Sequence, residues 1–361
     1  MLITSLPRHH NLTDPSTISN PGPDVWRLAE TGEWCTDDVG SLLGLSYRAA
    51  AAILRSKDLR PARIEVTSLG QITSGPVCDW AQRSLTFCDG EDHLRRRRHL
   101  SAHFDTTRTG PWDFNPPASG DVHDDLVAPA LISSFAARIG VPADDLAEIA
   151  DHVARFVTVF GYTATTAIES DLEALTAWVN ARPHLIDGLD DTALAVQILA
   201  GGWETVAAQA TNTVHLLCRQ PWLGQIASGE LDITNAVTEA TRFHPAAFAT
   251  LRMPDTKTVF QGFDVDDSTL CIAIISAANR DQTVYDDPHT FNPNRAFPRQ
   301  PLTFGAGAHH CLGASVAHSM IVELITKIVD RWGTGFALDA NQTWGSAHQP
   351  WHLVDLRYRT S

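Results

Sequence analysis

The sequence lacks the features of a membrane-anchored, secreted or disulfide-stabilised protein. No stretch reaches about 18 uninterrupted apolar residues, and the polar residues 1–22 contain no apolar core of a signal peptide. No CxxC pair or regular cysteine framework occurs in 361 residues, which is typical of reduced thiols. The six scattered cysteines are Cys35, Cys78, Cys88, Cys218, Cys271 and Cys311. We therefore expect a cytoplasmic protein with free thiols.

Positive charge is also scarce. There are 27 lysines and arginines against 42 aspartates and glutamates, which gives a formal net charge of −15. Nucleic acids and anionic membranes both require a broad basic face, so neither is an expected partner. The basic run Arg95–Arg98 is a local exception that needs its own explanation.

Neither an internal repeat nor a low-complexity linker divides the chain, and 43% apolar with 19% charged residues is ordinary for a globular protein. We expect a flexible N-terminal arm over residues 1–22 and one domain over residues 23–361. Alternating apolar residues within 248–275 predict short strands. Helical patterns cover residues 25–54, 92–104, 126–219 with breaks, 235–243 and 312–332. The predicted fold class is mainly α with a minor β-sheet.

The most informative segment is a glycine-rich loop over residues 304–314 that leads through Cys311 into the last long helix. Amide groups and partial positive charge at a helix N-terminus stabilise a thiolate and lower its pKa. A thiolate in such a loop suits an axial haem ligand. Three alternatives stay open: a phosphate loop without the usual Gly-Lys-Ser/Thr ending, a zinc site of His309, His310 and Cys311, and an inert buried cysteine.

This loop resembles the haem-binding signature of the cytochrome P450 superfamily, Phe-Gly-x-Gly-x-His-x-Cys-x-Gly. The matching residues are Phe304, Gly305, Gly307, His309, Cys311 and Gly313. The resemblance implies the P450 fold, with haem b between a distal central helix and the cysteine loop with the final helix. It also implies that Cys311 binds the iron, that Phe304 shields the thiolate and that His309 contacts a haem propionate.

A second resemblance supports the first. Glu239-Ala-Thr-Arg242 is similar to the family's Glu-x-x-Arg pair, and Arg295 in Asn-Pro-Asn-Arg occupies the position of the arginine that joins that pair. An isolated i, i+3 ion pair is common on helix surfaces and carries little weight alone. We interpret the three residues as a structural network that holds the cysteine loop.

The segment 199–206 resembles the family's oxygen-activating central helix. Gly201 and Gly202 would make room for dioxygen, and the acid–alcohol pair Glu204-Thr205 would deliver protons. Glycines inside a helix cost about 1 kcal/mol each against alanine, so something should offset them. The alternative is that the glycines permit close packing against another helix. If Thr205 faces the haem, the helical phase turns Trp203 away from the haem and into the protein core.

The family resemblance also explains the basic run Arg95–Arg98. His93 and Arg97 resemble the family's His-x-x-x-Arg pair that binds haem propionates, and Arg252 matches a third propionate ligand. Buried carboxylates require such cationic partners. The neighbouring Arg95, Arg96 and Arg98 either form a basic patch for an acidic ferredoxin or are simply solvated.

The resemblance spans about residue 25 to the C-terminus, but the interval from His93 to Thr205 is short for the family, so we expect a reduced lid over the substrate. The residues that we expect to contact substrate are Gln197, Ile198, Ala247, Phe248, Thr250 and Trp351.

The resemblance implies a monooxygenase that hydroxylates a small organic substrate in bacterial secondary metabolism. The chain carries no flavin or nicotinamide fingerprint, so electrons would come from a separate ferredoxin and ferredoxin reductase. Alternative functions are oxidative aromatic cross-linking of a peptide and the role of a catalytically silent helper. The silent role conflicts with the intact Cys311 and Glu204-Thr205 motifs.

Overall fold

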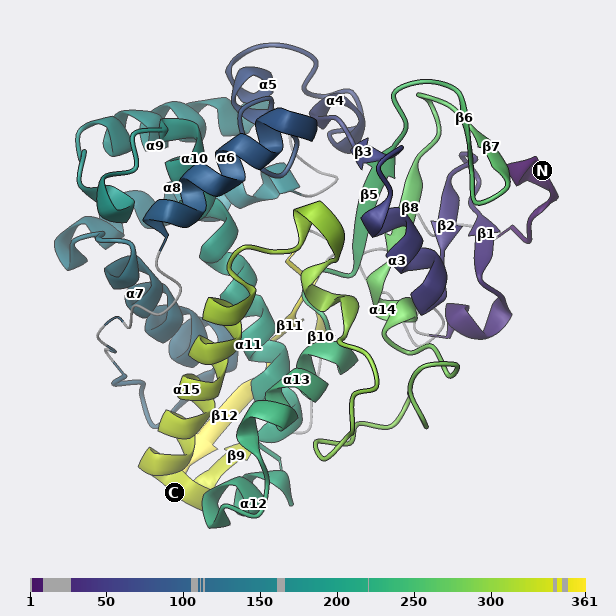
Figure 1. Ribbon diagram of the computed structural model, residues 1–361. Coiled ribbons are helices and arrows are strands. Elements are labelled where there is room, and N and C mark those ends of the chain that lie inside the picture. Colours follow the sequence, from purple (N-terminus) through teal and green to yellow (C-terminus); the bar gives the residue numbers. More distant parts are fainter. Residues whose placement is uncertain are drawn as a thin grey trace.

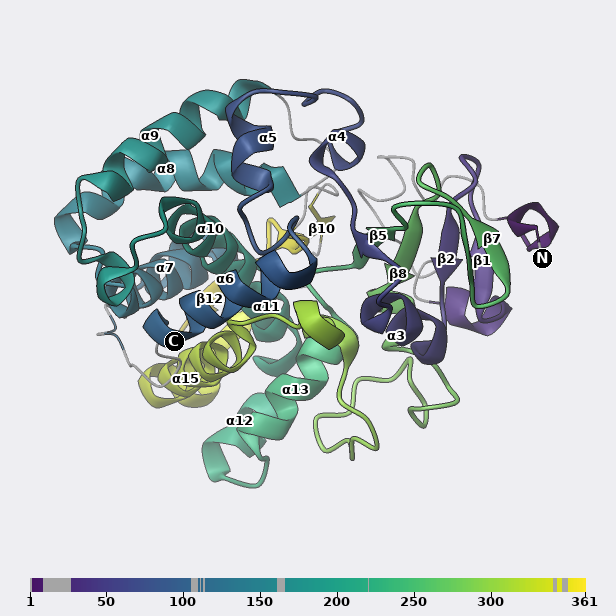
Figure 2. The ribbon, with the colours of Figure 1, turned by 45° about the horizontal axis from the view of Figure 1, so that its top comes forward.

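The computed structural model describes residues 2–8, 27–104, 110, 112, 114–160, 166–219, 221–339, 343–345 and 350–361. Most of the helices gather on one side of the molecule, and the largest sheet lies on the other (Figures 1 and 2). The predicted mainly α class with a minor β component is confirmed. Residues 9–22 of the predicted arm lie outside the described residues, and Arg8 bridges Thr36 of β1 (Trp34–Thr36).

The longer helices supply the predominantly α core. In chain order the helices are α3 (Tyr47–Arg55), α4 (Ile64–Thr67), α5 (Pro76–Ala81), α6 (Gly90–His103), α7 (Ala128–Arg138), α8 (Leu146–Phe156), α9 (Glu169–Asn180), α10 (Thr192–Gly202), α11 (Glu204–Leu217), α12 (Trp222–Ser228), α13 (Ile233–Phe243), α14 (Ile275–Ala278) and α15 (Ala314–Trp332). The predictions of helices near 92–104, 235–243 and 312–332 are confirmed by α6, α13 and α15.

The strands are short and form four sheets. The largest has the order β1, β2 (Leu42–Gly44), β8 (Cys271–Ile274), β5 (Ala249–Met253) and β3 (Arg60–Pro61). The others are β4 (Ser119–Asp121), β12 (Arg357–Thr360) and β9 (Phe336–Leu338); β6 (Thr258–Phe260) with β7 (Phe263–Val265); and β10 (Thr343–Trp344) with β11 (Leu353–Val354).

The centre of the helical part is α11, in which every residue from Val206 to His215 is buried. It packs against α7, α13 and α15. A buried helix must satisfy its polar side chains inside the protein. Gln209 does so by donating to the carbonyl of His244 and accepting from the amide of Ala246, and Asn212 donates to the carbonyl of Trp351. These bonds fix the chain on either side of α11.

The expected helix over residues 25–54 is wrong for residues 34–46, and residues 25 and 26 lie outside the described residues. Residues 34–44 instead form β1 and β2, and the helix begins only after Ser46, whose hydroxyl caps it by accepting from the amide of Ala49. β2 pairs in parallel with β8, more than 200 residues later in the chain. Such distant pairing overrides local helical periodicity and is invisible to a short sequence window.

The structure bears on two expectations about the whole chain, the free thiols and the lack of a membrane-spanning segment. All six cysteines lie in the described residues and are free. None of the helices in the described part of the chain combines the length and the apolar character needed to cross a bilayer.

Candidate functional site

A cavity of about 440 Å³ lies between the α10–α11 segment and the cysteine loop with the start of α15. Cys311 and Gly313 line one part of it, and Gly201 and Thr205 line another. Further wall comes from α6 and β5, elements that are distant in the sequence. The tertiary fold therefore brings the separately predicted motifs to one cavity.

The cysteine loop is held in a tight shape against α3. Gly305 and Gly307 both have positive φ, and the amide of Cys311 donates to the carbonyl of Phe304 over 2.9 Å. A Cβ on Gly307 would stand 2.8 Å from the carbonyl oxygen of Leu54, so only glycine permits this approach. The loop thus presents Cys311 to the cavity from a packed position.

The expectation of a lowered thiol pKa is wrong for Cys311. Burial by the surrounding protein raises its pKa, although the side chain is accessible from the cavity. A backbone hydrogen bond from Gly313 and the charge of Arg97 oppose that shift. Helix α15 begins at Ala314, three residues beyond Cys311, so the expected placement of the cysteine at the helix terminus is not met.

The Glu-x-x-Arg network is fully buried and ends at the cysteine loop. Glu239 pairs with Arg242 at 2.7 Å and with Arg295 at 3.0 Å, and Arg242 donates to the carbonyl of Asn279. The side-chain amide of Asn279 in turn donates from Nδ2 to the hydroxyl of Thr303, just before Phe304. This chain of bonds agrees with the structural role interpreted from the sequence.

Four cationic or titratable side chains converge on the cavity rim: His93, Arg97, Arg252 and His309. Burial, followed by the charges of His309 and Arg97, lowers the pKa of His93 to about 4, and burial lowers that of Arg252 to about 10. Both ring nitrogens of His93 are buried without a hydrogen-bond partner. Asp89 is the one nearby carboxylate in this cluster, 3.1 Å from Nε2 of His309. The cluster therefore carries the positive charge of Arg97 and Arg252, and the buried His93 ring can donate a hydrogen bond to an anionic group.

The cytochrome P450 family model matches residues 228–336, a range that contains the Glu239 network and the cysteine loop. Nocardicin C N-oxygenase of Nocardia uniformis subsp. tsuyamanensis is 27% identical over 316 residues, covering 76% of each chain. The 20-oxo-5-O-mycaminosyltylactone 23-monooxygenase of Streptomyces fradiae is 25% identical and covers 70% of this chain and 68% of its own. The chain belongs to the cytochrome P450 superfamily.

The fold agrees with this assignment. The crystal structure of CalO2 superposes with a TM-score of 0.83 at 18% identity, covering 97% of this P450 and 98% of that chain. Epothilone D-bound cytochrome P450epoK gives a TM-score of 0.78 at 19% identity. The curated relatives are monooxygenases, so the expected enzyme class, an oxidoreductase of the P450 monooxygenase type, is confirmed.

The family implies a haem cofactor, and the residues of this P450 fit it. Haem carries two propionates, and the orphaned His93 nitrogens and converging cations are what buried carboxylates require. A zinc ion would instead add positive charge to a rim that is already cationic. The ligand atoms of Asp89, His93 and His309 do lie within 4.8 Å of one another, but that group of possible metal ligands in the described residues does not include Cys311.

The central helix is interrupted where the glycines and the acid–alcohol pair meet. α10 ends at Gly202, Trp203 leaves the helical conformation with ψ −81°, and α11 begins at Glu204. The hydroxyl of Thr205 donates back across this break to the carbonyl of Gly201. Trp203 is only 1% exposed, which confirms its predicted place in the core.

The two glycines have different surroundings. A Cβ on Gly201 would meet nothing within 4 Å, so this position opens onto the cavity, as the resemblance implies. A Cβ on Gly202 would stand 2.1 Å from Cζ of Phe135 in α7. Gly202 therefore permits close packing of α10 against α7. This is the alternative role that the sequence left open for the two glycines.

Glu204 and Thr205 also point differently. Thr205 lines the cavity, whereas Glu204 is not among its lining residues and its carboxylate lies 3.7 Å from Nε2 of His123. The two side chains share the first turn of α11 but serve different neighbours. His123 was not foreseen, because it lies on the π-helical turn η3 (Val122–Val127), about 80 residues earlier and without a recognisable motif.

Four of the six expected substrate contacts line the cavity: Gln197, Ile198, Ala247 and Thr250. The expectation is corrected for the other two. Phe248 and Trp351 belong to a hydrophobic cluster of β2, β5 and β8, and Trp351 stacks on Trp344 with ring centroids 4.0 Å apart.

Several wall residues have no signal in the sequence. They come from loops or helices outside the recognised motifs, and they include Ala62, Thr67, Leu85, Phe87, Phe135 and Phe160. Only the stretch 85–87 had a positional hint, since it directly precedes the helix of His93. Phe304, Gly305 and Gly313 do line the cavity as expected.

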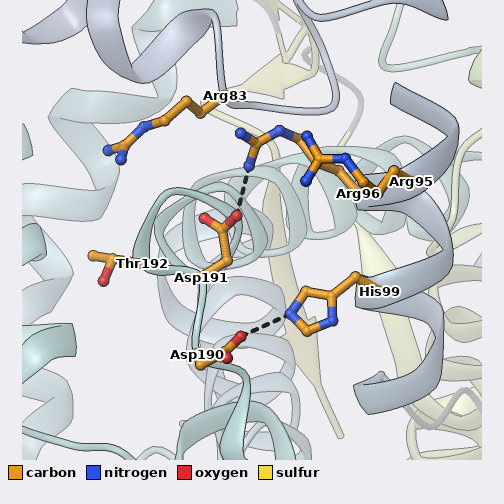
Figure 3. Close-up of a pocket in the computed structure, with 7 residues that line it drawn as sticks. All are labelled: Arg83, Arg95, Arg96, His99, Asp190, Asp191 and Thr192. Carbon is orange, nitrogen blue, oxygen red and sulfur yellow. Dashed lines mark hydrogen bonds and ion pairs between the residues drawn. The ribbon is translucent and has the colours of Figure 1, made fainter. Parts of the chain in front are cut away.

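The basic run is partly neutralised. Figure 3 shows a separate surface hollow between α6 and the start of α10, where Arg96 pairs with Asp191 and His99 with Asp190. Arg95 pairs with Asp92 of its own helix. Within the run, Arg97 is the residue that lines the cavity. The hollow is lined by none of the residues that line the Cys311 cavity, so it is not part of that site.

Proposed function

We propose that this P450 is a haem-thiolate monooxygenase that hydroxylates a small, mainly apolar organic molecule in bacterial secondary metabolism. The observation that carries the proposal is that one cavity is lined by Cys311, by Gly201 and Thr205, and by the cationic Arg97 and Arg252. The curated relatives named above act as an N-oxygenase and a 23-monooxygenase, which supports oxygen insertion as the reaction.

In this proposal Cys311 is the axial ligand of haem b, and the haem supplies dioxygen activation when it is bound. Phe304, Gly305 and Gly313 shape the loop around the sulfur. His93, Arg97, Arg252 and His309 hold the propionates, which gives the partnerless His93 nitrogens their acceptors. Gly201 leaves room above the ring, and Gly202 keeps α10 close to α7 through Phe135.

Proton handling falls to the first turn of α11. Thr205 is the group of this pair that faces the cavity, and its hydroxyl is positioned by the carbonyl of Gly201. Glu204 stands one residue before it, with its carboxylate turned to His123. We assign Thr205 to hold and orient a proton donor at the cavity, and Glu204 to supply protons to it.

The wall supports a neutral, largely apolar substrate. Around Ile198 it is formed by aliphatic and aromatic side chains such as Phe87 and Phe160, and no acidic or lysine side chain occurs among the described lining residues. Gln197 is tied down, since its Oε1 accepts from the amide of Leu85 and its Nε2 donates to Thr86. Gln197 therefore shapes the wall, and Ala247 and Thr250 are the contacts that we assign on the β5 side.

Electrons would come from a separate ferredoxin and its reductase. The exposed Arg95 and Arg98 on α6 supply positive charge for an acidic ferredoxin, although Arg95 is shared with Asp92. Exposed charges of this kind steer association more than they add affinity.

The test is oxidation by the purified haem-loaded protein with a surrogate ferredoxin and reductase. Amino acids, small peptides and polyketides are first screened for a spectral shift, and binders are then turned over. Hydroxylation predicts a product heavier by one oxygen atom. A product lighter by two hydrogens from a peptide would establish aromatic cross-linking instead, and consumption of reductant without any product from every binder would establish a silent protein.

A further inference from the structure

A histidine pair lies beside Glu204, and neither ring is among the residues that line the cavity. His123 of η3 and His352 of the C-terminal segment stack with ring centroids 4.0 Å apart and an interplanar angle of 21°. Nε2 of His123 is 3.7 Å from Oε2 of Glu204. The side chains of His123 and Glu204 are 12% and 20% exposed, so both are mostly buried but remain in contact with solvent.

The hydrogen bonds of His123 fix which of its nitrogens exchanges protons. Nδ1 lies 2.9 Å from the hydroxyl of Thr211, and that hydroxyl donates its own proton to the carbonyl of Ala207. A hydroxyl has one proton, so Thr211 must accept from His123, and Nδ1 carries a hydrogen. Nε2, the nitrogen facing Glu204, is then the atom that gains and loses a proton.

The stacked partner stays neutral. Burial, followed by the charge of His123, lowers the pKa of His352 to about 4, and its Nδ1 lies 3.4 Å from the carbonyl of Pro350. Two stacked imidazolium rings would repel each other, so the pair holds at most one positive charge. Among the described residues, the acidic groups whose charges act on His352 are Glu204 of α11 and Asp121 at the end of β4.

Asp121 cannot replace Glu204 in this arrangement. Its Oδ1 accepts the backbone amides of His123 and Asp124, as the N-cap of η3. It therefore anchors the turn that carries His123. Glu204 lies at the break between α10 and α11, directly before Thr205, so it is the acid placed between the histidine pair and the cavity.

We propose that His123 is the positioning and proton-supply residue that recharges Glu204 from solvent during turnover. This inference rests on the proposed monooxygenase function. In the step, the Nε2–H bond of the His123 imidazolium breaks and an O–H bond forms on the Glu204 carboxylate, directly or through one water. Neutral His123 then takes a proton from solvent, and no electrons move. Thr211 and His352 hold the ring in place.

The first test measures the pair itself, without turnover. Histidine-labelled haem-loaded protein, reduced and carbon-monoxide-bound so that it is diamagnetic, is titrated by NMR. Glu204→Gln should lower the pKa of His123 by about 1, because an opposite charge within about 4–6 Å favours the charged ring. An unchanged pKa of His123 in Glu204→Gln would overturn the proposal.

The second test uses His123→Asn, whose amide keeps the donor to Thr211 but has no titrating nitrogen. With an oxidised substrate, kcat should fall by at least about tenfold with an unaltered KM, and the solvent deuterium isotope effect should rise. The exposed His184→Asn is the matched control and should match the wild type. His352→Phe keeps a stacked ring and should retain most of the activity.

The outcomes separate the two proposals. A wild type that oxidises substrate, together with a His123→Asn variant of unchanged kcat and isotope effect, would defeat the relay and leave the monooxygenase function standing. A wild type without any product would defeat the proposed function, and the relay with it.

Discussion

Arg97 and Arg98 are neighbours on α6 with opposite surroundings. Arg97 lines the cavity, whereas Arg98 is exposed and donates to the carbonyl of Leu94. Hydrogen bonds to charged groups contribute about 1.5–3 kcal/mol, and each 1.4 kcal/mol is a tenfold change in an equilibrium. We expect Arg97→Ala to speed haem transfer to excess apomyoglobin by about ten- to a hundredfold, and Arg98→Ala to leave it unchanged. Equal rates in the two variants would contradict the assignment of Arg97 to a propionate.

At the level of elements, the break between α10 and α11 distinguishes two adjacent glycines. Gly202→Ala places a methyl group against the ring of Phe135, and such overpacking costs about 1–3 kcal/mol. Gly201→Ala meets no atom within 4 Å and should be neutral or stabilising by up to about 1 kcal/mol through helix propensity. Urea unfolding of both variants measures the difference, and Phe135→Leu should partly rescue Gly202→Ala. A Gly201→Ala variant that is the less stable of the two would be inconsistent with this packing.

The elements that the sequence predicts well are those whose signal is local. α6, α13 and α15 follow from periodicity, and the cysteine loop follows from its spacing. The strands β1 and β2 do not follow from local periodicity, because β2 pairs with β8, which is far away in the chain. Side-chain direction was the other limit: Trp351 turned away to stack on Trp344, and Glu204 turned to His123, an approach that only the tertiary fold creates.

At the level of the whole molecule, buried histidines link stability to pH. Burial lowers the pKa values of His93, His215 and His352 to about 4, below the 6.5 of a free histidine. The unfolded chain binds protons first as pH falls, so the free energy of unfolding should decrease from about pH 6.5 towards pH 4. His215→Gln should make that decrease shallower in urea unfolding of the haem-bound protein, compared with the exposed control His184→Gln. Parallel pH profiles for the two variants would refute the link.

The central claim is that the Cys311 sulfur is the axial ligand of the haem iron at the base of this cavity. The most direct measurement is the absorption spectrum of the reduced, carbon-monoxide-treated protein, for the wild type and for Cys311→Ser. We predict a strongly red-shifted Soret band in the folded, haem-loaded wild type and its loss in the variant. A folded, haem-loaded wild type without that band, or a variant with an unchanged spectrum, would contradict the account.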